Sequence, residues 1–312
     1  MAITKSDIPN LLLPGLKTEF DQAYRSRVEN GIAQQLATVV HTTIPSQKYA
    51  WLGSTPTMRE FVDERQPEGM REFHYTIEDK TFEASIAVDR RAVEDDQYDL
   101  IRIRVRELAD RVAEHQHKIV VEALAKGFSD AGYDGVSFFN TAHPTGGGST
   151  YGNRTTSALS ETALATAINQ MMQVPDDRGE PLGIVPDTLL VGPKLQWDAI
   201  ALIESPVVVY KGNSTDTAPS TPYKNVFQGK LKLVISPYLR GSYDDYWFLL
   251  DTSRAVRAVI LQQRSDVPVE FSALESGSQS ESAWWRDRYF YGVRARYNVG
   301  YGLWQTAYGA IL

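Results

Sequence analysis

Residues 97–128 read QYDLIRIRVRELADRVAEHQHKIVVEALAKGF, and this stretch decides the fold. Apolar residues recur at helical spacing and charged residues fill the positions between them, which predicts one long amphipathic helix. The acidic run at 94–96 favours a helix start, and Gly127 and Gly132 mark the expected end. At 1.5 Å per residue the helix would be roughly 45 Å long, so it predicts a rod on which other elements pack. The apolar positions are Ile101, Val105, Leu108, Val112, Ile119, Val120, Leu124 and Phe128.

The segment before this helix alternates between apolar and polar residues in the manner of β-strands. The alternation runs from Phe73 to Ile77 and again from Phe82 to Val88, and Pro67–Gly69 is a turn signal. We therefore predict that residues 49–92 form a long two-stranded arm that leaves the body and returns to the helix. Because an isolated hairpin is only marginally stable in water, such an arm implies a partner surface.

The C-terminal part of the chain is rich in strand patterns. In residues 284–299, WWRDRYFYGVRARYNV, apolar and arginine side chains fall on opposite faces of a predicted strand. A strand of this length can lie along the long helix. The apolar face carries Tyr289, Tyr291, Val293, Ala295 and Tyr297, and the other face carries Arg288, Arg294 and Arg296.

Helices and strands alternate in residues 133–252, which predicts a compact α/β region. Another helical pattern lies near residues 16–40 and is interrupted by Gly31. Its apolar face is too small to form a core alone, so we expect it to dock on another surface, another chain being one option. The predicted fold class is α+β. Within 133–252 we predict helices at 160–173, with Ser160 as N-cap, and at 193–203, and strands at 189–191, 231–235 and 246–250.

The composition excludes several classes of protein. The 312 residues include no cysteine, which removes disulfides, zinc–thiolate sites, iron–sulfur clusters and thiol catalysis. The net charge of −7 lacks the basic excess that is typical of a nucleic-acid-binding domain. No apolar run approaches the roughly 18 residues of a membrane span. The N-terminal residues lack the basic start of a secretory signal, so none is expected.

The sequence contains no complete catalytic or metal-binding pattern. His115 and His117 are two positions apart, so on a helix they point in different directions and cannot bind one ion. The acidic run at 94–96 is typical of helix capping and solvated charge. His143 has no nucleophile elbow or partner base beside it, and Gly146–Gly148 lacks the lysine of a phosphate loop. We therefore expect no catalytic residue, no cofactor and no metal site.

An ordered series of short motifs connects the chain to a known family. In order they are Tyr49–Gly53, Met58–Glu60, Lys80–Ala84, Glu94–Asp96, Gly127–Phe128, Tyr133–Gly135 and Phe138–Pro144. Together they resemble the major head (capsid) proteins of Mu-like tailed bacteriophages, which have the HK97-type shell fold. Members of that family often carry an acid where Asn140 and Ala142 stand in this chain, so we assign no chemistry to these two positions.

The resemblance implies that the chain divides into the parts of an HK97-type subunit. The N-terminal arm would be residues 1–48 and the extended E-loop residues 49–92. The peripheral domain would combine 93–132 with 253–299, its spine being the helix at 97–128 and the long strand at 284–299. The axial domain would combine 133–252 with 300–312.

The resemblance also implies a structural protein and not an enzyme. Pentamers and hexamers of it would assemble in the host bacterial cytoplasm into the icosahedral head shell of a tailed phage or prophage. That shell would enclose double-stranded DNA without reading its sequence, and it would involve no membrane. A separate scaffold protein is expected because no long N-terminal scaffolding segment is evident, and a portal and optional decoration proteins would be further partners. The alternative is an encapsulin-like nanocompartment shell that encloses protein cargo.

Mixed charges crowd the middle of the predicted E-loop and are the candidate contacts between subunits. We expect them to form salt bridges and hydrogen bonds with neighbouring copies. Each exposed pair would contribute only about 0–1 kcal/mol, which suits an assembly that repeats a weak contact many times and lets errors dissociate. The candidates are Arg59, Glu60, Asp63, Glu64 and Arg65.

Overall fold

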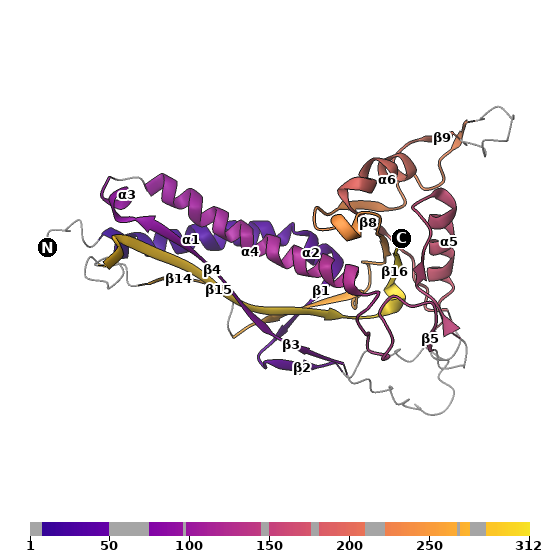
Figure 1. The fold of residues 1–312 in the computed structure, drawn as a ribbon, viewed down its shortest axis with the longest axis horizontal. Helices are drawn as coiled ribbons and strands as arrows, with labels where there is room; N and C mark the ends of the chain where they lie inside the picture. The colour runs from indigo at the N-terminus through magenta and orange to yellow at the C-terminus, as the bar shows by residue number, and fades with distance from the viewer. Residues whose placement is uncertain are drawn as a thin grey trace, which may run out of the picture.

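The computed structural model shows an elongated body that continues into a compact α/β end (Figure 1). A long helix and a long strand run side by side through the elongated body, and the compact end carries the C-terminus. The structure describes residues 8–49, 75–95, 98–144, 150–175, 181–209, 222–266, 269–274 and 285–312.

The long helix predicted at 97–128 is confirmed as α4 (Tyr98–Lys126). Its apolar stripe faces the sheet below it, and Val105, Val120 and Leu124 are fully buried. After residue 119 the helix is buried on more of its circumference, because it passes from the elongated body into the junction with the compact end. The stripe therefore joins two core clusters, one at each end of α4.

The predicted long strand is confirmed as β15 (Arg288–Tyr301), which begins four residues later than expected. Its tyrosine, valine and alanine face is buried under α4, and Arg288 and Arg294 are exposed on the opposite face. One side of β15 pairs with β13 (Val259–Arg264) and β14 (Glu270–Leu274), and the other side pairs with β4 (Lys80–Asp89). These strands belong to one five-stranded sheet, the main sheet of the elongated body. Its fifth strand, β1 (Ala37–Thr42), pairs in parallel with β13.

The strand β4 corrects the prediction that all of residues 49–92 form a projecting arm. Its ten residues pair with β15 from Asp89↔Arg288 to Lys80↔Tyr297, so the second strand of the predicted arm is a strand of the main sheet. The alternation does predict a strand, but alternation does not say which strand is the partner. β2 (Ser46–Lys48) and β3 (Thr76–Glu78) pair with each other and form the stem of the loop between them.

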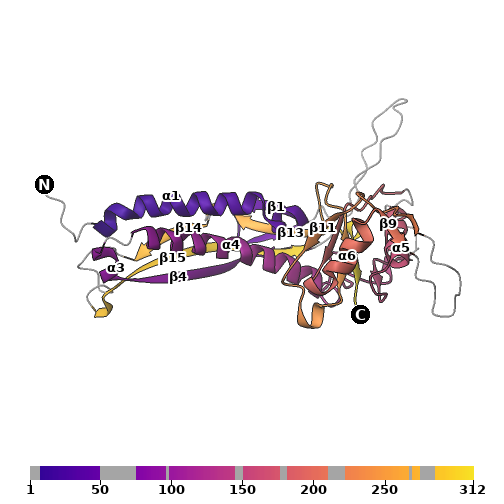
Figure 2. The ribbon, with the colours of Figure 1, turned by 90° about the horizontal axis from the view of Figure 1, so that it is seen from above.

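The N-terminal segment docks on its own subunit. α1 (Ile8–Glu29) runs beside α4 over the same face of the sheet (Figure 2), and its Leu16 and Phe20 are buried there. The predicted helix at 16–40 breaks at Gly31, as expected, and resumes as α2 (Ile32–Leu36). It ends before Val39 and Val40 because these residues pair with β13 instead. The short helix α3 (Arg90–Glu94) joins β4 to α4.

The compact end is built on a second sheet with the strand order β11-β8-β12-β16-β7. Its central strands are buried on both faces, against α5 and α6 on one side and the end of α4 on the other. The predicted N-cap is confirmed, since Ser160 Oγ accepts a hydrogen bond of 3.2 Å from the Ala163 amide. The elements are β7 (Arg154–Thr155), α5 (Glu161–Met172), β8 (Thr188–Val191), η2 (Pro193–Leu195), α6 (Gln196–Ile203), β11 (Lys232–Ile235), η3 (Gly241–Tyr243), β12 (Trp247–Leu250), η4 (Trp304–Thr306) and β16 (Ala307–Ala310), with the small pairs β5 (His143–Pro144)–β6 (Thr150–Tyr151) and β9 (Val207–Val209)–β10 (Pro222–Lys224).

Candidate functional site

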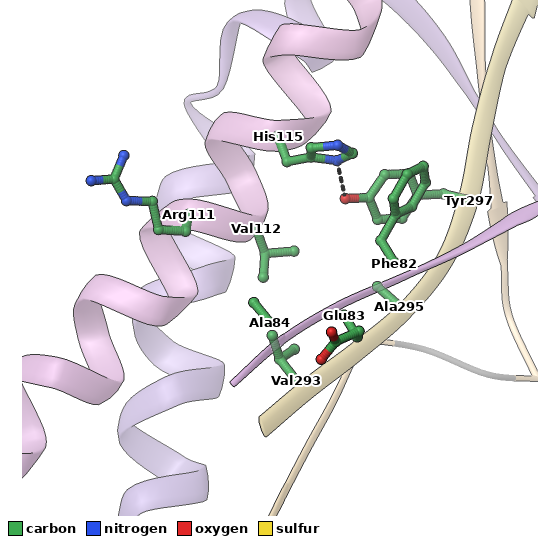
Figure 3. Close-up of a pocket in the computed structure, with 9 residues that line it drawn as sticks. All are labelled: Phe82, Glu83, Ala84, Arg111, Val112, His115, Val293, Ala295 and Tyr297. Atoms are coloured by element: carbon green, nitrogen blue, oxygen red, sulfur yellow. Dashed lines mark hydrogen bonds between the residues drawn. The ribbon is translucent and has the colours of Figure 1, made fainter. Parts of the chain in front are cut away.

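An apolar groove of about 200 Å³ lies between α4 and the strands β4 and β15. Figure 3 shows the side chains of α4 above the groove and those of the two strands below it. The groove exists because Ala84 and Ala295 are too small to fill the space under Arg111 and Val112. It is lined by Phe82, Glu83, Ala84, Arg111, Val112, His115, Val293, Ala295 and Tyr297.

The strand side of this groove is only half covered. On β4 the side chains of Phe82, Ala84 and Ile86 face α4 yet remain partly exposed, whereas the neighbouring β15 side chains on the same face are buried. Within the described residues β4 pairs with β15 alone, so its outer edge has no strand beside it. The row of apolar side chains and the groove thus open together along one edge of the sheet.

His115 and His117 contact different partners, as their spacing predicted. His115 Nδ1 lies 2.8 Å from the Tyr297 hydroxyl at one end of the groove, and its ring packs on Phe82. His117 Nε2 lies 3.0 Å from Ser236 Oγ, so this histidine joins α4 to the compact end. Burial lowers the pKa of His117 to about 4 and, helped by the nearby Lys118 charge, lowers the pKa of His115. Both rings are therefore neutral at pH 7.

The base of the predicted E-loop rests on a buried charge cluster that the sequence did not reveal. Asp79, directly after β3, lies 2.8 Å from Nη2 of Arg296 and 3.6 Å from Nη1 of Arg264. The Asp79 and Arg264 side chains are only 3% and 6% exposed, so each needs its partner. Arg264 also pairs with Asp266. The cluster joins the end of β3 to β13 and β15, which lie more than a hundred positions further along the chain. No local sequence pattern predicts such a contact.

Hydrogen bonds close the stem above this cluster. The Tyr49 amide donates to the Tyr75 carbonyl at 2.7 Å, and the Tyr49 hydroxyl lies 2.9 Å from Oε1 of the buried Gln262. Gln262 in turn donates to the Ile77 carbonyl. Both ends of the 50–74 segment are therefore tied to β13. The five predicted contact residues, Arg59, Glu60, Asp63, Glu64 and Arg65, lie outside the described residues.

His143 is buried in a structural network. Its Nδ1 lies 2.6 Å from Asp134 Oδ2, its Nε2 lies 3.0 Å from Asn153 Oδ1, and its ring stacks on Trp304 with 4.0 Å between centroids. Asn153 donates to the carbonyls of Phe138 and Trp304. The network therefore holds the C-terminal segment against the loop that follows α4.

Five cations on α4 form ion pairs with carboxylates of α4 or α1. Each pairing joins one cation to one carboxylate, either along the helix or across to α1. The pairs are Arg102–Asp99, Arg104–Glu107, Arg111–Glu114, Lys118–Glu122, Arg106–Glu19 and Arg27–Asp110.

Among the described residues, no group of three or more metal-ligating side chains is present, and no helix has the length and apolarity to cross a membrane.

The chain is similar in sequence to head proteins of Mu-like phages. The family model described as the Mu-like prophage major head subunit gpT matches residues 10–158, 150–239 and 240–311. The chain is 26% identical over 275 residues to the Mu-like prophage FluMu major head subunit of Haemophilus influenzae. That match covers 88% of this chain and 64% of the relative, so the chain spans less than two thirds of the relative's length.

Solved structures share the same architecture. The procapsid of bacteriophage JBD30 is 25% identical, with a TM-score of 0.56 over 97% of this chain and 75% of that chain. A virus-like particle from Pyrococcus furiosus has a TM-score of 0.56 over 95% of this chain and 98% of that chain, but at 10% identity it shows the fold alone. The spine helix, long strand and compact α/β end form the HK97-type capsid fold. Because the family model matches nearly the whole chain, the protein belongs to the family of Mu-like prophage major head subunits, gpT.

Proposed function

We propose that this chain is a major capsid subunit, which assembles as pentamers and hexamers into the icosahedral head shell of a Mu-like phage or prophage. The observation that carries this proposal is the family match from residue 10 to residue 311. The fold supports it, because the long body and the tied stem present surfaces that can bind further copies. Its role is structural and not enzymatic.

We propose the predicted division of the subunit with two adjustments, one to the loop and one to the N-terminal arm, whose β1 pairs with β13 of the main sheet. We assign residues 49–75, which the stem at β2 and β3 closes, to the projecting E-loop, and β4 to the peripheral domain together with α4 and β15. The compact end is the axial domain that surrounds the centre of each capsomer. In this arrangement Arg59, Glu60, Asp63, Glu64 and Arg65 contact neighbouring subunits.

Double-stranded DNA is enclosed without recognition of its sequence. Support comes from the net charge of −7 and from five cations of α4 that are already paired with carboxylates. A surface of this kind offers few free cations to displace counterions from phosphates, so binding to the isolated subunit would be weak. DNA is therefore held by confinement, and a scaffold protein, a portal and optional decoration proteins complete the head inside the host cytoplasm.

An encapsulin-like shell around protein cargo is the second candidate. The HK97-type fold is compatible with it, because the virus-like particle from Pyrococcus furiosus shares this fold over 98% of that chain. The two candidates differ in content, since one encloses nucleic acid and the other encloses protein. The family match to head subunits favours the phage head.

Particles purified from a host that carries the complete phage or prophage distinguish these functions. Nuclease-treated particles are sedimented, imaged and analysed for nucleic acid and protein. Closed shells with nuclease-protected DNA support the phage head, and closed shells with a co-purifying enzyme support the nanocompartment. A chain that remains monomeric under every assembly condition would contradict both.

A further inference from the structure

We propose that two copies of this chain join edge to edge through β4, in antiparallel pairing about a twofold axis at Ser85. The pairing would extend the main sheet, which contains β4 and β15, from one subunit into the next. The inference goes beyond the proposed function and rests on it only in requiring that copies of the chain meet.

The first argument is the state of the β4 edge. Within the described residues this ten-residue strand pairs on one side only, and it contains neither proline nor glycine. Long unpaired edges invite strand addition, and proteins usually protect them by charge, proline, bulges or a covering element. Here the apolar row of Phe82, Ala84 and Ile86 stands half exposed beside the open edge. A second strand would supply the missing hydrogen bonds and would cover this row.

The second argument is that β4 is complementary to itself. Directly opposed residues of an antiparallel pair lie on the same face, so only registers that pair even with even positions keep the apolar row together. With Ser85 opposite Ser85, the residue Phe82 meets Val88 and Ala84 meets Ile86 on the helix side. On the other face Glu83 meets Ala87 and Thr81 meets Asp89. Between positions 81 and 89 no charged residue then faces a like charge, and the one like-charge pair, Lys80 with Arg90 of the partner copy, lies at the very end of the pairing.

Neighbouring registers are less favourable. Moving the twofold axis two residues towards the N-terminus, to Glu83, sets Glu83 against Glu83 of the partner copy, which is destabilising. Moving it one residue towards the C-terminus, to Ile86, sets Glu83 against Asp89, which is destabilising as well. An axis at Ala84 pairs Ala84 with Ala84 and leaves two small side chains beside each groove. The proposed register instead places Ile86 of one copy beside Ala84 of the other, at the mouth of the 200 Å³ groove. Each copy thus fills the cavity of its partner.

The absence of cysteine makes this register testable by disulfide formation. Ser85→Cys would place two sulfurs on the twofold axis, where opposed Cα atoms are about 4.5–5.5 Å apart and within disulfide range. Ser272→Cys is the matched control. Ser272 is also an exposed serine, in the same cross-strand row through Gly292. Its copies would lie five strand spacings apart, about 24 Å, which is too far to bridge.

Both variants are expressed as full-length protein, and unassembled subunits and particles are treated with a mild oxidant and run on a non-reducing gel. We expect most Ser85→Cys chains to become covalent dimers and Ser272→Cys chains to remain at the background level. Absence of the Ser85→Cys dimer from both fractions, or equal dimer yields for the two variants, would overturn the proposal. Such a result would also follow if another extended segment occupied the edge. Particle yield is scored separately and tests the proposed function.

Discussion

At the scale of the residue, Asp79 balances two arginines at the base of the proposed E-loop. Asp79→Asn would leave the 6%-exposed Arg264 with Asp266 alone and would deprive Arg296 of its acid. Removing one partner of a buried ion pair typically costs about 3–5 kcal/mol, and we expect a loss of about 3 kcal/mol here because Arg264 keeps one partner. Urea unfolding of the subunit followed by circular dichroism measures the loss.

Asp99→Asn is the control for this prediction. Asp99 is 96% exposed and pairs with Arg102 at 3.7 Å, so its removal should change the free energy of unfolding by less than about 1 kcal/mol. Equal effects of the two substitutions would show that the Asp79 cluster contributes no more than a surface pair.

His117 makes the stability of the junction between α4 and the compact end depend on pH. Burial holds its pKa near 4 in the fold, below the ordinary value of 6.5, so the unfolded chain binds the proton more readily. The contribution of the neutral ring is therefore complete above pH 6.5 and is lost as the pH falls towards 4. At pH 5 we expect a loss of about 1 kcal/mol, reduced from the full shift because the side chain is partly exposed.

His117→Gln tests this pH dependence. Glutamine can still bond to Ser236 but does not titrate, so the free energy of unfolding of the variant should fall less between pH 7 and pH 5 than that of the wild type. Parallel pH profiles for the two proteins would rule out His117 as the source.

At the scale of the element, the turn from β15 into η4 depends on a glycine without a side chain. A Cβ on Gly302 would lie 2.0 Å from the Arg257 carbonyl oxygen, and backbone at that position cannot move aside cheaply. Gly302→Ala should therefore destabilise the subunit by more than about 2 kcal/mol.

In α1, a Cβ on Gly15 meets nothing within 4 Å, so Gly15→Ala should stabilise by about 0.5–1 kcal/mol through helix propensity. Thermal unfolding measures both variants, and the unfolding temperature should fall for Gly302→Ala and rise for Gly15→Ala. A Gly302→Ala protein as stable as the wild type would contradict the close contact of Gly302 with the Arg257 carbonyl oxygen.

At the scale of the whole molecule, the charges of the proposed E-loop are predicted to act between subunits and not within one. Reversing Arg59 and Arg65 together to glutamate would set like charges against the acids of a neighbour. We expect folded, soluble subunits with unchanged circular dichroism that fail to close shells, or that form shells which dissociate in salt. Sedimentation and electron microscopy measure the yield. The Arg59→Lys, Arg65→Lys variant keeps both charges and should assemble, and a double-glutamate variant with normal yield and heat resistance would refute the contact.

The order of elements could be predicted from local patterns, and the partners of those elements could not. The 3.6-residue period of 97–128 is a property of one helix and needs no partner to be seen. As a result, α4 begins and ends within two residues of the predicted bounds. The alternation at Phe82–Val88 predicts a strand equally well in a free hairpin or in a central sheet. Only the pairing with β15, more than 190 positions away, showed that β4 belongs to the body. The local pattern around Val39 predicts a helix, but Val39 lies in β1. Its strand partner is Leu261, which is far along the chain and leaves no trace in the local pattern.

By itself the sequence determined the amphipathic spine, the buried face of the long strand, the α+β class, the lack of thiol chemistry and, through its ordered motifs, the family. These follow from periodicity and residue type, which act over a few neighbours. Tertiary structure alone decided where the groove opens, that α1 docks on its own subunit, that Asp79 meets Arg264 and Arg296, and that β4 has an open edge within the described part of the chain. Each of these depends on residues brought together across long stretches of chain, and the free energy that selects them comes from packing and charge pairing in the folded molecule.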